Sequence, residues 1–358
     1  MKILHTNLGI NSYDILINRG LIENIGAELK KIYNNKKVFV VTDENVAHFY
    51  GDTVLYSLKQ AGYETYLFAL KPGEKTKNFD SLIHIYEHML KFGLTRGEMV
   101  VALGGGVVGD VTGFSASTFL RGVPYVQVPT SLLAQVDSSV GGKVAVDLRE
   151  GKNLVGSFYQ PKLVLIDPDV LNTLSDKFFL DGLGEVIKYA LIGDKRLYSI
   201  LTGNVDRKSL SENIEEIIFR SCDLKRGIVE NDEYDTGDRM LLNFGHTLAH
   251  AIEKYHSYEY YTHGQAVCVG MSVITQISES LGLTAKGSAE KVCSLIKSHK
   301  LDIYPKEPVK NYLSEIIYDK KMIAGKMNIV ILKDISHAEI IQIPDNFIKT
   351  AESLDYIR

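Results

Sequence analysis

Four of the ten histidines of this chain lie within residues 241–267, in the stretch LLNFGHTLAHAIEKYHSYEYYTHGQAV. His246 and His250 are four residues apart, so a helix would place both imidazoles on one face. A zinc-protease helix would have a glutamate directly after the first histidine, whereas this chain has Thr247 there. The stretch is therefore a candidate source of metal ligands, but not in the zinc-protease arrangement.

The best candidate for a third ligand is Glu185, in GLGEVIKYALIG. This helical pattern is otherwise largely apolar, and a lone carboxylate there is costly unless it meets a cation. Two imidazoles and one carboxylate are a common catalytic zinc set with one position open for substrate, which selects Glu185, His246 and His263. His256, which lies beside tyrosines, favours a structural role. The alternative is that Glu185 only pairs with Lys188 and that the histidines make ordinary hydrogen bonds.

A second candidate site is the glycine-rich turn in VVALGGGVVGDVTGF, where Gly104, Gly106 and Gly109 fit G-x-G-x-x-G. Glycines at such a turn let the backbone approach a pyrophosphate at a helix N-terminus. The usual acid about 20 residues later is missing, but Asp43 ends an earlier strand pattern and offers a partner for a ribose hydroxyl. A merely structural tight turn is the alternative.

Several cations stand beside glycines and apolar runs instead of on polar helix faces. Converging cations suit a small substrate that bears a phosphate and a carboxylate. Asp137, in AQVDSSVGGK, would hold a water or polarise a lysine, or would simply cap a turn. For each cation taken singly, an ordinary surface position is the alternative. The cations are Arg121, Lys143, Lys152, Lys188, Lys225, Arg239 and the pair Lys320 and Lys321.

The elements that must position these residues change character near residue 175. Before it, five short apolar runs alternate with helical patterns, which predicts a mainly parallel α/β sheet in a domain of residues 1–174. After it, long helical periodicities predict a mostly helical, all-α domain of residues 175–358, with one short β-rich piece in MNIVILKD. The predicted strands are 38–41, 65–69, 100–103, 125–128 and 163–166. The predicted helices are 78–92, 107–117, 179–192, 209–229, 239–255, 264–279 and 289–298.

Composition bounds the class of protein. The chain has 358 residues, a net charge of −4 and three cysteines. This charge favours neither a nucleic-acid nor a membrane partner, and no apolar run approaches a membrane span. Few, widely spaced cysteines and no signal-peptide pattern favour a reducing compartment. We therefore expect a two-domain cytoplasmic protein.

Taken together, the motifs resemble those of one family, the 3-dehydroquinate synthases among the sugar phosphate cyclases. They occur in that family's order and extend from Asp43 to Lys321. The motifs are PGEKTK, GGGVVGDVTGF, VPTSLLAQVDSSVGGKVAVD, GKNLVGSF, GLGEVIKYALI, LLNFGHTLAHAIE, HGQAV and YDKK.

The resemblance implies an enzyme with an NAD-binding α/β domain, a helical metal- and substrate-binding domain and a homodimeric assembly. Its activity would be the conversion of 3-deoxy-D-arabino-heptulosonate 7-phosphate into 3-dehydroquinate and phosphate in the shikimate pathway. The route would be transient oxidation by NAD, β-elimination of phosphate, re-reduction and intramolecular aldol closure. The divalent metal would be zinc, with cobalt as the alternative.

The resemblance also assigns residues by matching motif positions. The metal ligands would be Glu185, His246 and His263. The NAD site would comprise Asp43, Gly73, Glu74, Lys77, Gly105, Gly106, Val107, Val108, Gly109, Asp110, Thr130, Ser131, Lys143, Lys152, Val170, Leu171, Asn172 and Thr173. The substrate contacts would be Asp137, Lys143, Asn153, Lys188, Lys225, Arg239, Asn243, His250 and one of Lys320 or Lys321, with Arg121 reaching the neighbouring subunit's site.

This chain departs from the family pattern at two places that bear on the site. Gln265 stands where the family usually has glutamate, which predicts that an acid next to His263 is missing. Phe178 and its neighbours replace the usual residues after Thr173, which argues against an NAD contact from that side chain. Competing interpretations are a 2-deoxy-scyllo-inosose synthase, a polyol dehydrogenase of the glycerol dehydrogenase type, and a non-catalytic NAD-binding regulator.

Overall fold

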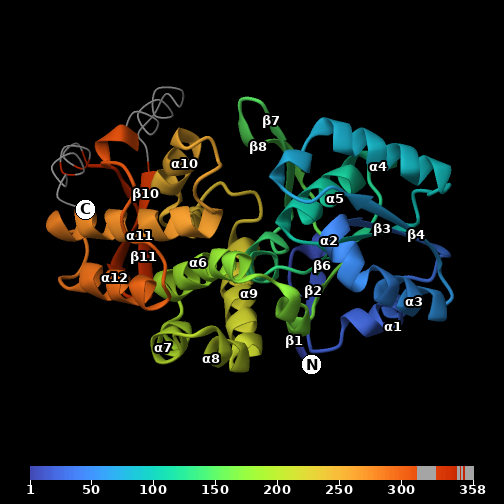
Figure 1. The fold of residues 1–358 in the computed structure, drawn as a ribbon, viewed down its shortest axis with the longest axis horizontal. Coiled ribbons are helices and arrows are strands. Elements are labelled where there is room, and N and C mark those ends of the chain that lie inside the picture. The colour runs from blue at the N-terminus through green and yellow to red at the C-terminus, as the bar shows by residue number, and fades with distance from the viewer. Residues whose placement is uncertain (313–327, 345–346, 348–349, 351–358) are drawn as a thin grey trace. The chain divides into compact units, whose positions relative to one another are not determined.

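The computed structural model describes residues 1–312, 328–344, 347 and 350 of the chain. The chain divides into two compact units, Met1–Phe179 and Leu180–Arg358 (Figure 1). The sequence pattern changes near residue 175, whereas the division of the structure falls within the first turns of a long helix, Asp176–Ile192.

The first unit is built on a seven-stranded sheet in the order β1-β2-β9-β6-β5-β3-β4. Neighbouring strands run parallel, except that β1 and β2 are antiparallel, so the predicted mainly parallel sheet is confirmed. Its strands are β1 (Lys2–Thr6), β2 (Tyr13–Ile17), β3 (Lys37–Asp43), β4 (Glu64–Leu70), β5 (Met99–Gly104), β6 (Tyr125–Pro129) and β9 (Leu163–Ile166). The five predicted strands are confirmed in β3, β4, β5, β6 and β9.

Alternating side chains of β3 enter two different cores, as the two-residue period of a strand requires. Val38 and Val40 belong to the core that includes residues of α1 and α3, and Phe39 and Val41 to the core that includes residues of α4 and α5. Helices therefore cover both faces of the sheet (Figure 1). The helices are α1 (Ile25–Ile32), α2 (Glu44–Val46), α3 (Asp52–Gln60), α4 (Phe79–Lys91) and α5 (Gly106–Thr118). Short helical turns are η1 (Gly9–Asn11), η2 (Ile22–Asn24), η3 (Ala47–Gly51), η4 (Glu74–Thr76), η5 (Phe119–Arg121), η6 (Ala134–Ser138) and η7 (Pro168–Thr173).

Sequence patterns did not predict β1, β2 or a hairpin formed by β7 (Lys143–Leu148) and β8 (Gly151–Phe158). The edge strand β1 reads KILHT, in which polar residues outnumber apolar ones, so its apolar signal is weak. Every residue of β8 is at least partly exposed, so this strand lacks the buried apolar positions on which strand prediction depends.

The second unit is mostly helical, as predicted. Its helices are α6 (Asp176–Ile192), α7 (Lys195–Gly203), α8 (Arg207–Glu212), α9 (Ile214–Asn231), η8 (Asp238–Asn243), α10 (His246–Tyr255), α11 (His263–Ser280) and α12 (Ser288–Ser298). A hairpin of β10 (Asn328–Asp334) and β11 (His337–Gln342) contains the predicted β-rich piece. The central helix α11 is buried along most of its length and contacts α10, α12 and β10.

Two predicted helices are each divided, which corrects the ranges 209–229 and 239–255. The first is interrupted at Asn213, whose side-chain amide donates to the carbonyl of Ser209 and so competes with helical hydrogen bonds. The second is interrupted at Gly245, which has the left-handed φ of 82° that glycine adopts without strain. As a result, His246 is the first residue of α10 and not a mid-helix residue.

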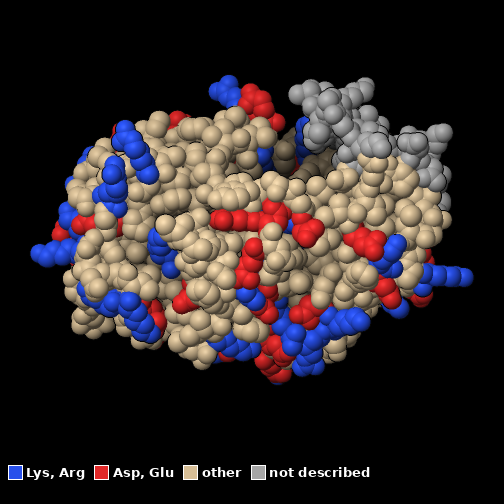
Figure 2. All heavy atoms as spheres, turned by 180° about the vertical axis from the view of Figure 1, so that it is seen from behind, with Lys and Arg blue, Asp and Glu red and all other residues tan. Residues whose placement is uncertain are grey.

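Among the described residues, no helix combines the length and the apolar character that a membrane crossing requires. Figure 2 shows Lys and Arg side chains interspersed with Asp and Glu side chains over the face that it presents. This mixed surface matches a chain whose basic and acidic residues nearly balance.

Candidate metal and nucleotide sites

Three helix segments of the second unit are in direct backbone contact at glycine residues. A Cβ atom on Gly264 of α11 would lie 1.9 Å from the carbonyl oxygen of Asp181 in α6, and one on Gly184 would lie 2.5 Å from the carbonyl oxygen of Gly264. Farther along α11, a Cβ on Gly270 would lie 2.1 Å from the carbonyl oxygen of Gly245, the residue before α10. Side chains at these glycines would force the segments apart, so glycine is required for this junction.

The predicted metal ligands adjoin these glycines in the sequence and meet in space. Oε1 of Glu185 lies 3.3 Å from Nε2 of His246 and 3.2 Å from Nε2 of His263. One ligand atom from each of the three residues lies within 4.8 Å of the others. The structure therefore brings together the three residues that sequence reasoning selected from separate helices.

The carboxylate of Glu185 is fully buried, and Nζ of Lys188 lies against its Oε2. Among the described residues, neither carboxylate oxygen accepts a well-formed hydrogen bond. Burial opposes ionisation of this carboxyl, but the charges of Lys188 and the contacts with the histidines hold its pKa well below its usual range. The alternative ion pair of Glu185 with Lys188 is thus present, together with the two imidazoles.

The electrostatics of the cluster favour a positive charge between its carboxylates. Burial lowers the pKa of His246. Burial also opposes a charge on His263, but the carboxylates of Glu185 and Glu253 outweigh it and raise the pKa of His263 to about 10. A divalent cation would take the place of the proton on His263. Two imidazoles and one carboxylate are donors that suit Zn²⁺ or Co²⁺, so these residues fit such an ion.

One sequence-based expectation is wrong: His263 does not lack an acidic neighbour. Oε2 of Glu253, a buried residue of α10, lies 3.4 Å from Nδ1 of His263. Gln265 instead completes a capping box at the start of α11, where its side chain accepts a hydrogen bond from the backbone N–H of Thr262. The signal that could have found Glu253 is its position seven residues after His246, on the same helical face.

Three of the predicted substrate-contact cations in the second unit, Lys188, Lys225 and Arg239, are buried rather than at the surface. The backbone N–H of Arg239 donates to a carboxylate oxygen of Asp232 at 3.0 Å, and its Nη1 donates to the carbonyl of Glu233 at 2.5 Å. These bonds fix the short turn that presents the guanidinium. A cation held in a buried position attracts an entering anion more strongly than a cation in water does, which fits a binding role for an anionic ligand.

Other predicted residues of the second unit lie nearby in the sequence but differ in exposure. Asn243 and His250 are exposed. The ring of His250 lies 5.6 Å from that of His246 and 6.2 Å from that of His263 between centroids. His256 instead contacts the hydroxyl of Tyr312 at 3.1 Å within an aromatic group, which is consistent with a structural role. Lys320 and Lys321 lie outside the described residues.

In the first unit, most predicted nucleotide-binding residues lie at or just after the carboxyl ends of five parallel strands. Ligands of open α/β sheets bind at these ends, because the loops that follow them gather at one edge. Asp43 ends β3; Gly73, Glu74 and Lys77 follow β4; Gly105–Asp110 follow β5; Thr130 and Ser131 follow β6; and Val170–Thr173 follow β9. Lys143 and Lys152 belong to the hairpin of β7 and β8.

The glycine-rich turn connects β5 directly to α5, which begins at Gly106. Built Cβ atoms on Gly105 and Gly106 would lie 3.4 Å from Oγ of Ser131 and 3.2 Å from Oγ of Ser138. The turn thus places a helix N-terminus, without side chains of its own, beside two hydroxyl groups. Such a turn fits the phosphates of a dinucleotide.

Lys77 joins several of the predicted residues of the first unit. It is buried, its Nζ donates to Oδ2 of Asp110 at 2.5 Å, and it also contacts Oδ1 of Asn153. Burial lowers the pKa of Lys77, but Asp110 and Glu74 outweigh burial, and the pKa is raised overall. Its carbonyl accepts from Asp147, whose carboxylate accepts from the backbone of Asn153. Two of the predicted NAD residues, Lys77 and Asp110, therefore form one network with the predicted substrate residue Asn153.

The remaining predicted residues of this unit occupy separate positions. Asp43 accepts backbone hydrogen bonds from the first turn of α2, so it also serves as a helix cap. The hydroxyl of Tyr50 contacts Thr173 at 2.7 Å and so holds η7. Arg121 is exposed and has a left-handed φ of 69°, Lys143 is exposed at the start of β7, and Asp137 lies on η6.

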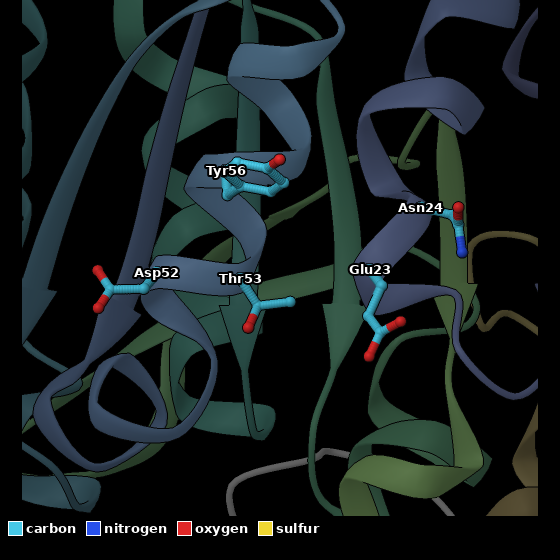
Figure 3. Close-up of a pocket in the computed structure, with 5 residues that line it drawn as sticks. All are labelled: Glu23, Asn24, Asp52, Thr53 and Tyr56. Atoms are coloured by element: carbon cyan, nitrogen blue, oxygen red, sulfur yellow. The ribbon is translucent and has the colours of Figure 1, made fainter.

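An open cavity of about 600 Å³ lies elsewhere in the first unit (Figure 3). It is lined from η2 by Glu23 and Asn24, and from α3 by Asp52, Thr53 and Tyr56. None of the predicted site residues lines it. The predicted nucleotide-binding residues therefore lie at the strand ends and in the hairpin of β7 and β8, outside this cavity.

Comparison with known families matches both halves of the chain. Residues 67–181 match the family described as 3-dehydroquinate synthase N-terminal, and residues 182–322 match the family described as 3-dehydroquinate synthase C-terminal. The 3-dehydroquinate synthase of Clostridium botulinum (strain Alaska E43 / Type E3) is 53% identical over 340 residues, which cover 94% of this chain and 97% of that protein. The 3-dehydroquinate synthase of Clostridium acetobutylicum is 48% identical over 358 residues, which cover 99% and 97%.

Solved structures show the same fold. The 2-epi-5-epi-valiolone synthase from Streptomyces hygroscopicus subsp. jinggangensis 5008, with NAD⁺ and Zn²⁺ bound, has a TM-score of 0.86 at 26% identity, covering 96% of each chain. A 2-deoxy-scyllo-inosose synthase, complexed with carbaglucose-6-phosphate, NAD⁺ and Co²⁺, has a TM-score of 0.86 at 20% identity, covering 98% of this chain and 100% of that chain. The glycerol dehydrogenase from Schizosaccharomyces pombe has a TM-score of 0.66 at 15% identity, covering 96% and 89%.

Proposed function

The chain belongs to the 3-dehydroquinate synthase family, and we propose that it converts 3-deoxy-D-arabino-heptulosonate 7-phosphate into 3-dehydroquinate and phosphate. In this proposal the protein is a carbon–oxygen lyase that depends on NAD and one divalent cation. The observation that carries the proposal is the cluster of Glu185, His246 and His263, found in a chain about 50% identical to 3-dehydroquinate synthases over most of its length.

Each cofactor has residues that fit it. Glu185, His246 and His263 would hold Zn²⁺ or Co²⁺, and the strand ends of the first unit would hold NAD. When bound, NAD supplies a reversible hydride acceptor, and the cation supplies a Lewis acid that makes a substrate hydroxyl more acidic. Within the NAD site, Lys77 would neutralise phosphate charge while Asp110 and Asn153 keep its ammonium group in place.

The substrate carries a phosphate and a carboxylate, and both must be neutralised when they leave water. We assign the buried cations Lys188, Lys225 and Arg239 to this task, together with Asn243 of the same unit. Arg239 is pre-positioned by its backbone bond to Asp232, so little ordering remains to be done on binding. Asp137, Lys143 and Asn153 of the first unit, and one of Lys320 or Lys321, complete the proposed set.

Proton transfer is proposed for His250. It is exposed on the helix that begins with His246, so it would accept and return the proton of the hydroxyl that is oxidised. Phosphate elimination then needs a proton acceptor next to the carbonyl. The leaving phosphate would take that proton itself, so no dedicated strong base is required.

A homodimer belongs to the same proposal, with Arg121 reaching the neighbouring subunit's site. The exposure of Arg121 and its position at a sharp corner of backbone after α5 support this role. A cytoplasmic location is also proposed, and it is supported by three cysteines that are all free thiols.

The decisive experiment measures phosphate release from 3-deoxy-D-arabino-heptulosonate 7-phosphate with NAD⁺ and Zn²⁺, with and without a chelator. Phosphate release should require both NAD⁺ and the cation, and NADH should not accumulate, because the hydride is returned in each turnover. Steady NADH formation with glycerol, without phosphate release, would instead identify a polyol dehydrogenase. The absence of both reactions would leave a non-catalytic NAD-binding protein.

A further inference from the structure

The imidazole of His263 lies between two carboxylates from two different helices. Its Nε2 lies 3.2 Å from Oε1 of Glu185 in α6, and its Nδ1 lies 3.4 Å from Oε2 of Glu253 in α10. Both ring nitrogens are therefore directed at acids. Nε2 of His263 and Nε2 of His246 both approach the same oxygen atom, Oε1 of Glu185.

Glu253 is in an unusual place for a carboxylate. Its relative exposure is 3%, and its neighbours in the helix, Ala251 and Ile252, are buried apolar residues. Glutamate is rarely buried to this extent unless it is paired. Its carboxylate contacts His263, which lies ten positions later on another helix. This pairing gives a reason for the burial.

A histidine that binds a metal through one nitrogen commonly donates its other N–H to a carboxylate. That hydrogen bond fixes the tautomer, the ring orientation and the basicity of the ligand. We infer that Glu253 is a positioning residue, which holds His263 with its proton on Nδ1 and the lone pair of Nε2 directed at the cation. The inference rests on the proposed function only in that the cluster binds a divalent cation.

The same geometry explains why Gln265 is tolerated. Gln265 is engaged in the capping box at the start of α11, and Glu253 supplies the acid from α10. Helix α10 thus contributes a ligand at its first residue, His246, and the support of the other histidine two turns later. Helices α10 and α11 also pack against each other, so a movement of α10 would displace both imidazoles together.

A competing arrangement uses the same atoms differently. Ligand atoms of His250, Glu253 and His263 also lie within 4.8 Å of one another, which would make Glu253 a ligand itself. The contacts of Glu185 favour the first arrangement, because its buried Oε1 lies 3.3 Å from Nε2 of His246 and 3.2 Å from Nε2 of His263. His250 is exposed, whereas Glu185 is fully enclosed.

The test measures the Zn²⁺ dissociation constant by competition with a chromophoric chelator, in the absence of substrate. Glu253→Ala should weaken Zn²⁺ binding by about 10- to 100-fold, the usual effect of removing such a support. Glu253→Gln, which keeps an acceptor oxygen but no charge, should give an intermediate value. Glu259→Gln is the matched control, because Glu259 is exposed on the loop between the same two helices, and it should bind as the wild type does.

A spectroscopic reading separates positioning from general damage. With Co²⁺ in place of Zn²⁺, the visible absorption bands of Glu253→Gln should shift, because the imidazole ligand has changed its orientation and basicity. If Glu253→Ala does not fold, the Gln variant and its Co²⁺ spectrum still decide the matter. Wild-type affinity and spectrum in Glu253→Gln would overturn the inference.

Two further outcomes are distinguishable. If His250→Ala loses Zn²⁺ while Glu185→Gln retains it, the cation is held by His250 and Glu253, and the positioning role is wrong. If Glu253→Gln weakens Zn²⁺ binding but the wild type releases no phosphate from the heptulosonate phosphate, the proposed function fails and the positioning role stands. The binding assay therefore does not depend on turnover.

Discussion

The two candidate sites are assembled in opposite ways. In the first unit, the residues proposed for NAD follow successive strands, and the parallel sheet itself brings their loops to one edge. In the second unit, Glu185, His246 and His263 come from three helices that meet only because glycines allow backbone contact. The first site is a result of topology, and the second is a result of close packing.

The difference predicts different sensitivities. A sheet edge tolerates a change in one loop, because the other loops remain attached to their own strands. At a junction with a carbonyl oxygen 1.9 Å from a built Cβ, an added side chain fits only if the packed segments shift together. A substitution at the strand ends of the first unit should therefore act locally, whereas one at the glycine junction of the second unit should displace several helix segments.

The largest expected loss of ligand affinity comes from replacing one charged residue in each site. Glu185→Gln should lower metal affinity by well over about 100-fold, since loss of a supporting residue alone has up to that effect. It should also cost about 3–5 kcal/mol of stability, because Lys188 would lose its buried partner. Lys77→Met should weaken NAD⁺ binding by about 10- to 100-fold, the range for a charged hydrogen bond, with metal content unchanged.

Elemental analysis and calorimetric titration of NAD⁺ check both variants. If the sites are separate, the NAD⁺ dissociation constant of Glu185→Gln stays within about twofold of that of the wild type. A large loss of NAD⁺ affinity in Glu185→Gln would show that the metal cluster also organises the strand ends, and the comparison would then be wrong.

A smaller effect should come from added methyl groups at glycines. Gly264→Ala should destabilise the protein by about 1–3 kcal/mol and lower its metal content, because the helix contact must open. Gly105→Ala, whose Cβ would meet only the side chain of Ser131, with Oγ at 3.4 Å, should cost at most about 1 kcal/mol while weakening NAD⁺ binding.

Gly227→Ala is the matched control in the second unit, because a Cβ on this residue of α9 would meet nothing within 4 Å. This variant should be more stable than the wild type by up to about 1 kcal/mol, owing to the better helix propensity of alanine. Thermal unfolding and metal content measure all three. Unchanged metal content and stability in Gly264→Ala would contradict the packing argument.

The smallest expected effect is on the pH dependence of stability, through one aspartate in each unit whose carboxylate accepts backbone hydrogen bonds. Burial raises the pKa of Asp43 above its ordinary 3.8, against the effect of its backbone hydrogen bonds. Backbone hydrogen bonds from Thr236, Arg239 and Gly237 lower the pKa of Asp232 to about 2. Asp232 therefore stabilises the fold above its ordinary pKa and loses this contribution as the pH falls toward about 2. The contribution of Asp43 is unfavourable at neutral pH and is relieved as the pH falls.

Denaturation of Asp232→Asn and Asp43→Asn across about pH 6 to pH 3 checks the opposite signs. The free energy of unfolding of Asp232→Asn should lie below that of the wild type at about pH 6, and this difference should become smaller as the pH falls. The gain in free energy of unfolding that Asp43→Asn shows at about pH 6 should become smaller in the same way. Curves that keep a constant separation at every pH would refute both assignments.

Sequence reasoning predicted the central strands of the first unit best. Buried strands such as β5 and β6 are nearly continuous apolar runs, and their parallel order follows from the intervening helices. The exposed hairpin strand β8 has no such signal, so it was missed. In the second unit, periodicity found most of the helices but missed α7. It also missed the interruptions at Asn213 and Gly245, which depend on local hydrogen bonding and on contacts with distant residues.

The candidate metal site shows the same limit. Ligand chemistry and family resemblance selected Glu185, His246 and His263, but spacing along the chain contains no information about helix packing. Glu253 was missed, although it follows His246 and His250 on one helical face, because a glutamate in a helix is more often a solvated residue. Burial, which only the three-dimensional structure provides, distinguishes it.

The glycine junction also has an evolutionary consequence. Because backbone atoms, and not side chains, set the spacing of the three ligand positions, that spacing cannot drift through gradual substitution of larger or smaller residues. The proposed ion-binding site would therefore be inherited together with the helix crossing, while the exposed and loop residues around it would remain open to change. Selection for a new substrate could then act on the residues around the proposed site without first changing the helix crossing.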